Sequence, residues 1–143
     1  MPASQLLDLL KKTNIHHSFD YLDNLFLLSI GLKKNNKEKL SGLIIDGGMS
    51  SFADVATLFA PQYAQYIEQI LKGVYQSKED LKFTQGLPKL FIYNKKDATV
   101  PFLQGQTNFA NAAEPKTFLE AGNEHIQAMK DEESVVLKAI SNL

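Results

Sequence analysis

The 143-residue chain contains no cysteine and no arginine, and each absence narrows the chemistry open to it. Without cysteine, disulfides, thiolate metal sites and a cysteine nucleophile are excluded. All 15 basic residues are lysines, so the chain lacks the planar guanidinium group that binds phosphates and carboxylates through two parallel hydrogen bonds. Chemistry centred on phosphate groups is therefore disfavoured.

The sequence also lacks an excess of charge of one sign and any long apolar run. Its 15 lysines oppose 16 carboxylates, the formal net charge is −1, and no basic stripe is present. Nucleic acid is therefore not expected as a partner. No apolar stretch reaches membrane-spanning length, and residues 1–12 lack the pattern of a signal peptide. We therefore expect a soluble, cytoplasmic protein with no membrane partner.

What is present is the composition of one globular domain, residues 1–143. Hydrophobic residues make up 44% of the chain and charged residues 22%, and the chain is long enough to bury a core. From residue 41 onward, short apolar runs alternate with segments of helical periodicity. The predicted strands are 41–46, 89–93 and 116–121, and the predicted helices are 52–59, 63–74, 102–110 and 135–140. This alternation predicts a three-layer α/β sandwich, in which helices flank a short parallel sheet of three or four strands.

The first 40 residues differ from this pattern, and we interpret them as a divergent helical part preceding 41–143. Residues 5–12 have helical periodicity. The run 25–32 fits either a strand or part of a buried helix at about residues 19–34. The strand alternative leaves only residues 33–40 for a crossover between parallel strands, which usually needs about a dozen residues, so we favour the helix.

His16 and His17 are adjacent in a polar stretch of this N-terminal part. A metal site would require further ligands at suitable spacing, and the sequence contains no such set. We therefore interpret the two histidines as solvated loop residues. No metal and no other cofactor is expected.

Three segments of the C-terminal part resemble, in order and spacing, the last three strands of α/β-hydrolases of the bem46-like and serine-aminopeptidase-like group. The segments are 42–52 (GLIIDGGMSSF), 90–102 (LFIYNKKDATVPF) and 118–125 (FLEAGNEH). The resemblance covers residues 41–143 and implies a truncated α/β-hydrolase fold. It also implies that Asp97 occupies the position of the catalytic acid and His125 that of the catalytic histidine.

The positions of Asp97 and His125 also make physical sense without the family. Both residues follow strand ends, and functional groups of parallel α/β sheets gather at the carboxyl ends of the strands. A carboxylate beside a histidine fixes the tautomer of the ring and stabilises the imidazolium that forms when the histidine takes a proton. Asp97 fits a second role as well, because aspartate often caps a helix such as the one expected near Val100.

A nucleophile is the element that the sequence does not supply clearly. Serine hydrolases carry the serine in a G-x-S-x-G turn, and no such motif occurs in the chain. The nearest string is 27–31 (LLSIG), in which leucine replaces the first glycine and Ser29 is the candidate. Ser50 and Ser51 match the cap of the following helix instead. The family's first strands, together with the loop that supplies one oxyanion-hole N–H, have no counterpart.

The resemblance therefore implies a protein related to serine esterases and peptidases that acts on a small ester or peptide substrate. In it His125 would be the general base, and Asp97 would orient His125. The alternatives are a non-catalytic remnant that serves as a binding or interaction module, and half of a split hydrolase. A truncated parallel sheet exposes an unpaired edge. Either the N-terminal helices expected at 5–12 and about 19–34 cover that edge, or a second copy of the chain or a complementing chain pairs with it.

Overall fold

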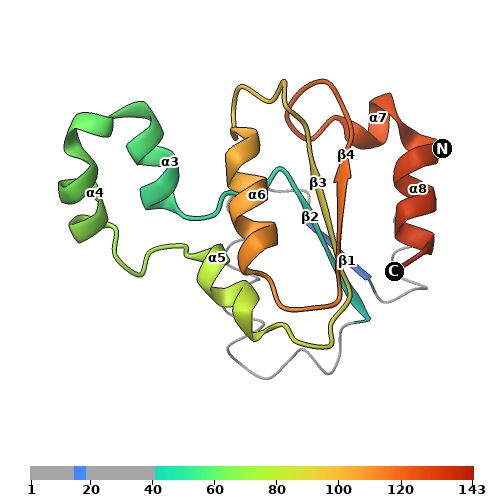
Figure 1. Cartoon of the computed structure of the whole chain (residues 1–143). Helices are drawn as coiled ribbons and strands as arrows, with labels where there is room; N and C mark the ends of the chain where they lie inside the picture. The colour runs from blue at the N-terminus through green and yellow to red at the C-terminus, as the bar shows by residue number, and fades with distance from the viewer. Residues whose placement is uncertain (1–14, 19–40) are drawn as a thin grey trace.

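The computed structural model describes residues 15–18 and 41–143, and only the backbone of the first segment. The expected helices at 5–12 and 19–34, the alternative strand at 25–32 and Ser29 lie outside the described residues. The described part of the chain forms a parallel sheet with helices on both faces (Figure 1). The predicted three-layer α/β architecture is thereby confirmed.

Among the described residues the sheet contains four strands in the order β1-β2-β3-β4, and every neighbouring pair is parallel. The strands are β1 (Ile15–Ser18), β2 (Gly42–Asp46), β3 (Lys89–Tyr93) and β4 (Lys116–Glu120). The three predicted strands agree with β2, β3 and β4 to within one residue at each end. β1 is a fourth strand, the upper number that the sequence allowed.

Strand β1 overturns the interpretation of His16 and His17 as loop residues. The two histidines lie within the strand, where they pair with Leu43 and Ile44 of β2. The physical reason is that the backbone ladder to β2 fixes the strand. Because this ladder is formed by backbone groups, it does not require the apolar run by which the other three strands were recognised.

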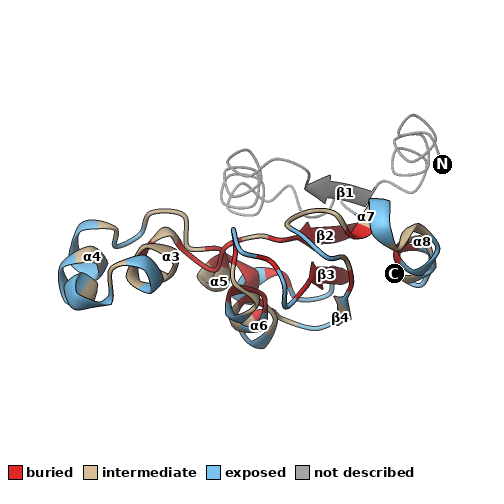
Figure 2. Cartoon of the chain, turned by 90° about the horizontal axis from the view of Figure 1, so that it is seen from above, coloured by how far each residue is buried: buried red, intermediate tan, exposed pale blue. Residues whose placement is uncertain are grey.

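The helices occupy the segments between the strands and the C-terminal end of the chain. They are α3 (Phe52–Phe59), η2 (Pro61–Tyr63), α4 (Ala64–Ile70), α5 (Ser77–Asp80), η3 (Leu81–Phe83), α6 (Phe102–Asn111), α7 (Ala128–Asp131) and α8 (Glu133–Ser141). Helices α5 and α6 lie on one face of the sheet and α7 and α8 on the other (Figures 1 and 2).

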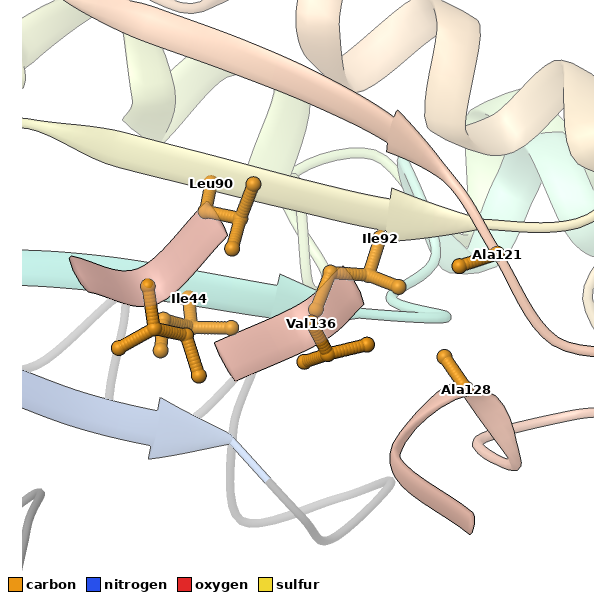
Figure 3. Packing of buried hydrophobic residues seen from close by; sticks show 7 residues of the cluster. Ile44, Leu90, Ile92, Ala121, Ala128 and Val136 are labelled. Carbon is orange, nitrogen blue, oxygen red and sulfur yellow. The ribbon is translucent and has the colours of Figure 1, made fainter. Parts of the chain in front are cut away.

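Alternate residues of β2 and β3 build two separate cores, one on each face of the sheet. Ile44, Leu90 and Ile92 pack against α7 and α8, with Ala128 and Val136 facing them (Figure 3). The opposite core is formed by the intervening strand residues and by side chains from η3, α6 and β4, among them Leu43, Ile45, Leu81, Phe91, Tyr93, Phe109 and Phe118. Because successive side chains point to opposite faces, a strand covered on both sides reads as a continuous apolar run.

Helices α3 and α4 extend away from the sheet (Figures 1 and 2). The N-cap predicted for α3 is present, since Ser51 Oγ accepts a hydrogen bond of 2.9 Å from the backbone N–H of Asp54. Large apolar side chains of this segment are exposed, namely Leu58, Phe59, Tyr63, Tyr66 and Ile70. No helix within residues 41–143 has the length and apolarity needed to cross a membrane.

The packing of α8 can be tested with two matched substitutions, one at a buried and one at an exposed valine. Val136 is 1% exposed and packs in the core beneath α8, whereas the adjacent Val135 is 44% exposed. We expect Val136→Ala to lower the free energy of unfolding by about 2 kcal/mol, because two buried methyl groups are lost. Val135→Ala should change it by less than about 0.5 kcal/mol. Urea unfolding of both variants tests the difference, and equal losses would contradict the packing described.

Candidate active site

The structure brings the two site residues predicted from the sequence into direct contact. Asp97 lies in the loop after β3 and His125 in the loop after β4, so parallel pairing of the two strands carries both to the carboxyl edge of the sheet. His125 Nδ1 lies 2.7 Å from Asp97 Oδ2, within hydrogen-bond distance. The side chain of Asp97 is 2% exposed and that of His125 is 18% exposed.

Asp97 contacts the histidine and also closes a turn, but it does not cap the helix as the alternative expected, because α6 has Pro101 as its N-cap residue and no side-chain cap. Its Oδ1 accepts hydrogen bonds of 2.8 Å from the backbone N–H groups of Thr99 and Val100, which closes the turn before α6. Its Oδ2 binds His125. The cap of this turn therefore fixes the carboxylate in the orientation that presents Oδ2 to the imidazole.

The loop that carries His125 is held from both sides by hydrogen bonds. The backbone N–H of Gly122 donates to Glu132 Oε1 at 2.9 Å, and Asn94 Nδ2 donates to the carbonyl of Glu124 at 2.8 Å. Ile126 follows the histidine with a φ of 55°, a conformation that costs a β-branched residue about 1–2 kcal/mol. The loop therefore stores strain next to His125, which surrounding contacts must offset.

Gly47, in the loop after β2, provides the surface on which the His125 ring rests. Gly47 has a φ of +65°, and a Cβ added there would lie 2.8 Å from His125 Cε1 and 3.0 Å from Nδ1. The absence of a side chain thus allows the imidazole to approach the backbone closely. Three loops, following β2, β3 and β4, meet at this point.

The loop after β2 is anchored by buried polar side chains. Tyr93 Oη donates to the carbonyl of Gly48 at 2.6 Å, and Asn108 Nδ2 donates to the carbonyl of Met49 at 3.0 Å. Gln104 Oε1 accepts from both the N–H and the hydroxyl of Ser50, at 3.1 and 2.6 Å. Burial is the main cause of a raised pKa of Tyr93, so its hydroxyl keeps its proton and remains a donor. Ser50 therefore has a structural function in this loop, as Ser51 has in the α3 cap.

Asp46, the last residue of β2, is a member of this site that the sequence reasoning missed. Its side chain is buried and has no hydrogen bond to any residue of the described chain. Burial raises the pKa of Asp46 to about 6; attraction to His125 opposes that shift and repulsion from Asp97 adds to it. The rule that singled out Asp97 and His125, position at a strand end, would have identified Asp46 as well.

The same rule, position at a strand end, also identifies Ser18, the last residue of β1. It pairs with Ile45, one residue before Asp46, so its backbone lies at the same edge of the sheet as the Asp97–His125 pair. The segment 16–20 reads HHSFD, with the serine at its centre. Within residues 41–143, no group of three or more His, Asp or Glu side chains could hold a metal ion.

Comparison with solved structures defines the class of fold. The chain aligns over 96% of its length with a hydrolase from Pseudomonas aeruginosa (TM-score 0.55, 10% identity) and with an enol-lactonase from Burkholderia xenovorans LB400 (TM-score 0.57, 11% identity), covering 69% of each. An alpha/beta hydrolase superfamily protein from Enterococcus faecalis gives a TM-score of 0.51 at 12% identity, over 96% of the chain and 68% of that protein. The chain therefore has the α/β-hydrolase fold.

Comparison with protein sequences agrees with this fold. The chain is 26% identical to Protein bem46 of Schizosaccharomyces pombe over 74 residues, which cover 52% of the chain and 25% of bem46. No protein-family model matches the chain. The resemblance to α/β-hydrolases predicted from the three segments is confirmed, and the match spans about a quarter of bem46.

The contact between Gly47 and His125 leads to a test with a matched control. We expect Gly47→Ala to displace the imidazole and break its hydrogen bond to Asp97, because the new Cβ would overlap the ring. The low-field NMR resonance of the His125 Nδ1 proton should then disappear. Gly73→Ala introduces the same kind of backbone strain, since Gly73 has a φ of +80°, but its Cβ would meet no atom within 4 Å. Loss of the resonance in both variants would contradict a specific contact at Gly47.

Asp46 leads to a prediction about stability and pH. A carboxyl whose pKa is higher in the folded chain stabilises that state while it is protonated, and this contribution is lost as the pH rises from 3.8 to about 6. We therefore expect the unfolding free energy of the wild type, relative to Asp46→Asn, to fall by about 3 kcal/mol between pH 3.5 and 7. Urea unfolding of both proteins at the two pH values measures this difference. A difference that stays constant, or rises, would contradict the assignment.

Proposed function

We propose that the chain acts as an α/β-hydrolase on small esters or peptides, with His125 as general base and Asp97 as the acid that orients it. The observation that carries the proposal is the 2.7 Å contact between His125 Nδ1 and Asp97 Oδ2 at the carboxyl edge of the sheet. An Asp97 carboxylate that accepts the Nδ1 proton leaves Nε2 as the basic nitrogen. Nε2 then removes a proton from the attacking hydroxyl and returns it to the leaving group.

Ser18 is the serine that we propose as nucleophile. In serine hydrolases of this fold the nucleophile stands at a sharp turn between a strand and a helix. Ser18 ends β1, and its partner Ile45 lies two residues before Gly47, on which the His125 ring rests. The string 16–20 (HHSFD) has the spacing of G-x-S-x-G, with His16 and Asp20 in place of the two glycines. This placement and the spacing of the string support Ser18 as the nucleophile.

A non-catalytic binding module is the second candidate, and the same string favours it. The glycines of G-x-S-x-G allow the backbone to turn sharply and to approach neighbouring strands. His16 and Asp20 bring side chains to those positions. A protein of this second kind would keep the fold and the Asp97–His125 contact without turning over a substrate.

Labelling with a fluorophosphonate probe separates the two candidates. We expect the wild-type chain to be labelled, Ser18→Ala to abolish labelling, and Ser29→Ala to retain it. Asp97→Asn and His125→Ala should slow labelling at least about a hundredfold, because the serine loses its base or the base loses its orientation. Circular dichroism of each variant provides the control for folding. A folded wild-type chain that takes up no probe would exclude the catalytic proposal and support the binding module.

A further inference from the structure

We infer that Asp46 is a second carboxylate of the site, whose negative charge sets the affinity of His125 for a proton. Asp46 acts on the histidine through its charge. It makes no contact with a substrate in this proposal. The inference concerns the site of the proposed function, but it holds for the folded chain whether or not substrate is turned over.

The first argument is the place of Asp46 in the sheet. Asp46 ends β2 between the ends of two other strands, since β1 and β3 flank it and Ile92 is its partner on β3. The next residue, Gly47, is the one against which the His125 ring packs. A single peptide unit therefore separates the Asp46 backbone from the surface that supports the imidazole.

The second argument is that the Asp46 side chain has no hydrogen-bond partner among the described residues. The residue is 8% exposed, yet this carboxyl forms no hydrogen bond within the described chain. By contrast, Asp97 accepts three hydrogen bonds, and Asp54 is paired with Lys78 at 2.7 Å. A buried carboxyl without hydrogen bonds costs stability, so its presence requires another explanation. Proximity to the histidine supplies one.

The third argument concerns the charges around Asp46. The titratable groups that interact with it are His125 from the loop after β4, Asp97 from the loop after β3, and Tyr93 of β3, whose hydroxyl donates to Gly48. On β1 the titratable residues are His16 and His17. Their partners on β2, Leu43 and Ile44, precede Asp46 by three and two residues. A negative Asp46 in this setting favours the imidazolium form of His125. Neutralising Asp46 removes that stabilisation.

The test is an NMR titration of the His125 imidazole in the full chain, with the resonance assigned through His125→Gln. We expect Asp46→Asn to lower the midpoint of the His125 titration by about 0.5–1 pH unit, a roughly three- to tenfold loss of proton affinity. Asp46→Glu, which restores the charge, should return the midpoint toward that of the wild type. A merely structural role would not produce this reversal.

Glu120→Gln is the matched control, because Glu120 also ends a strand at the same edge but is exposed and paired with Lys95 at 2.8 Å. It should leave the midpoint unchanged. An Asp46→Asn midpoint within about 0.2 pH unit of the wild type, or an equal shift in Glu120→Gln, would overturn the inference. If Asp46→Asn does not fold, Asp46→Ser, which is also neutral, gives the same reading. Failure of fluorophosphonate labelling would leave these midpoints unaffected, so the two proposals fail separately.

Discussion

The hydrogen bond between His125 and Asp97 depends on the parallel pairing of β3 with β4. The register that sets Tyr93 opposite Glu120 makes both strands end at the same level, so the loops that follow start side by side. Each loop is then fixed by its own contacts: the turn that binds Asp97 Oδ1, and the bonds from Gly122 and Asn94 on the histidine side. Sheet register therefore sets the distance between the two side chains, and the loop contacts set their orientation.

Helix α6 links this pair to the loop after β2. The turn closed by Asp97 leads into α6, and Gln104 and Asn108 of that helix bind the backbone of the loop that begins at Gly47. A shift of α6 would therefore move both the acid and the surface beneath the imidazole. Such a network stabilises the loop only when each member is bonded, because an unsatisfied buried polar group costs more than a hydrogen bond contributes.

The parts of the fold that the sequence predicted are those where local pattern and burial agree. β2, β3 and β4 were recognisable because apolar runs bounded by turn residues match strands covered on both faces. β1 was not, because the ladder to β2 determines it and its own residues are largely polar. Lys89 shows the same limit. It is the first residue of β3, is fully buried and donates a hydrogen bond of 2.8 Å to the carbonyl of Thr84. No sequence pattern predicts this contact.

The same limit applies to the site: some of its residues could be predicted from their position in the sequence, and some of its properties required the packing. Asp97 and His125 were predictable because they follow strand ends within segments that resemble a known family. Asp46 also stands at a strand end, but its burial and its lack of hydrogen bonds to the described residues could be known only from the structure. Asp97 has hydrogen bonds at both oxygens, so its geometry is fixed; Asp46 has none to the described residues, so its charge is available to act over a distance. One carboxylate thus orients the imidazole, and the other adjusts how strongly it holds a proton.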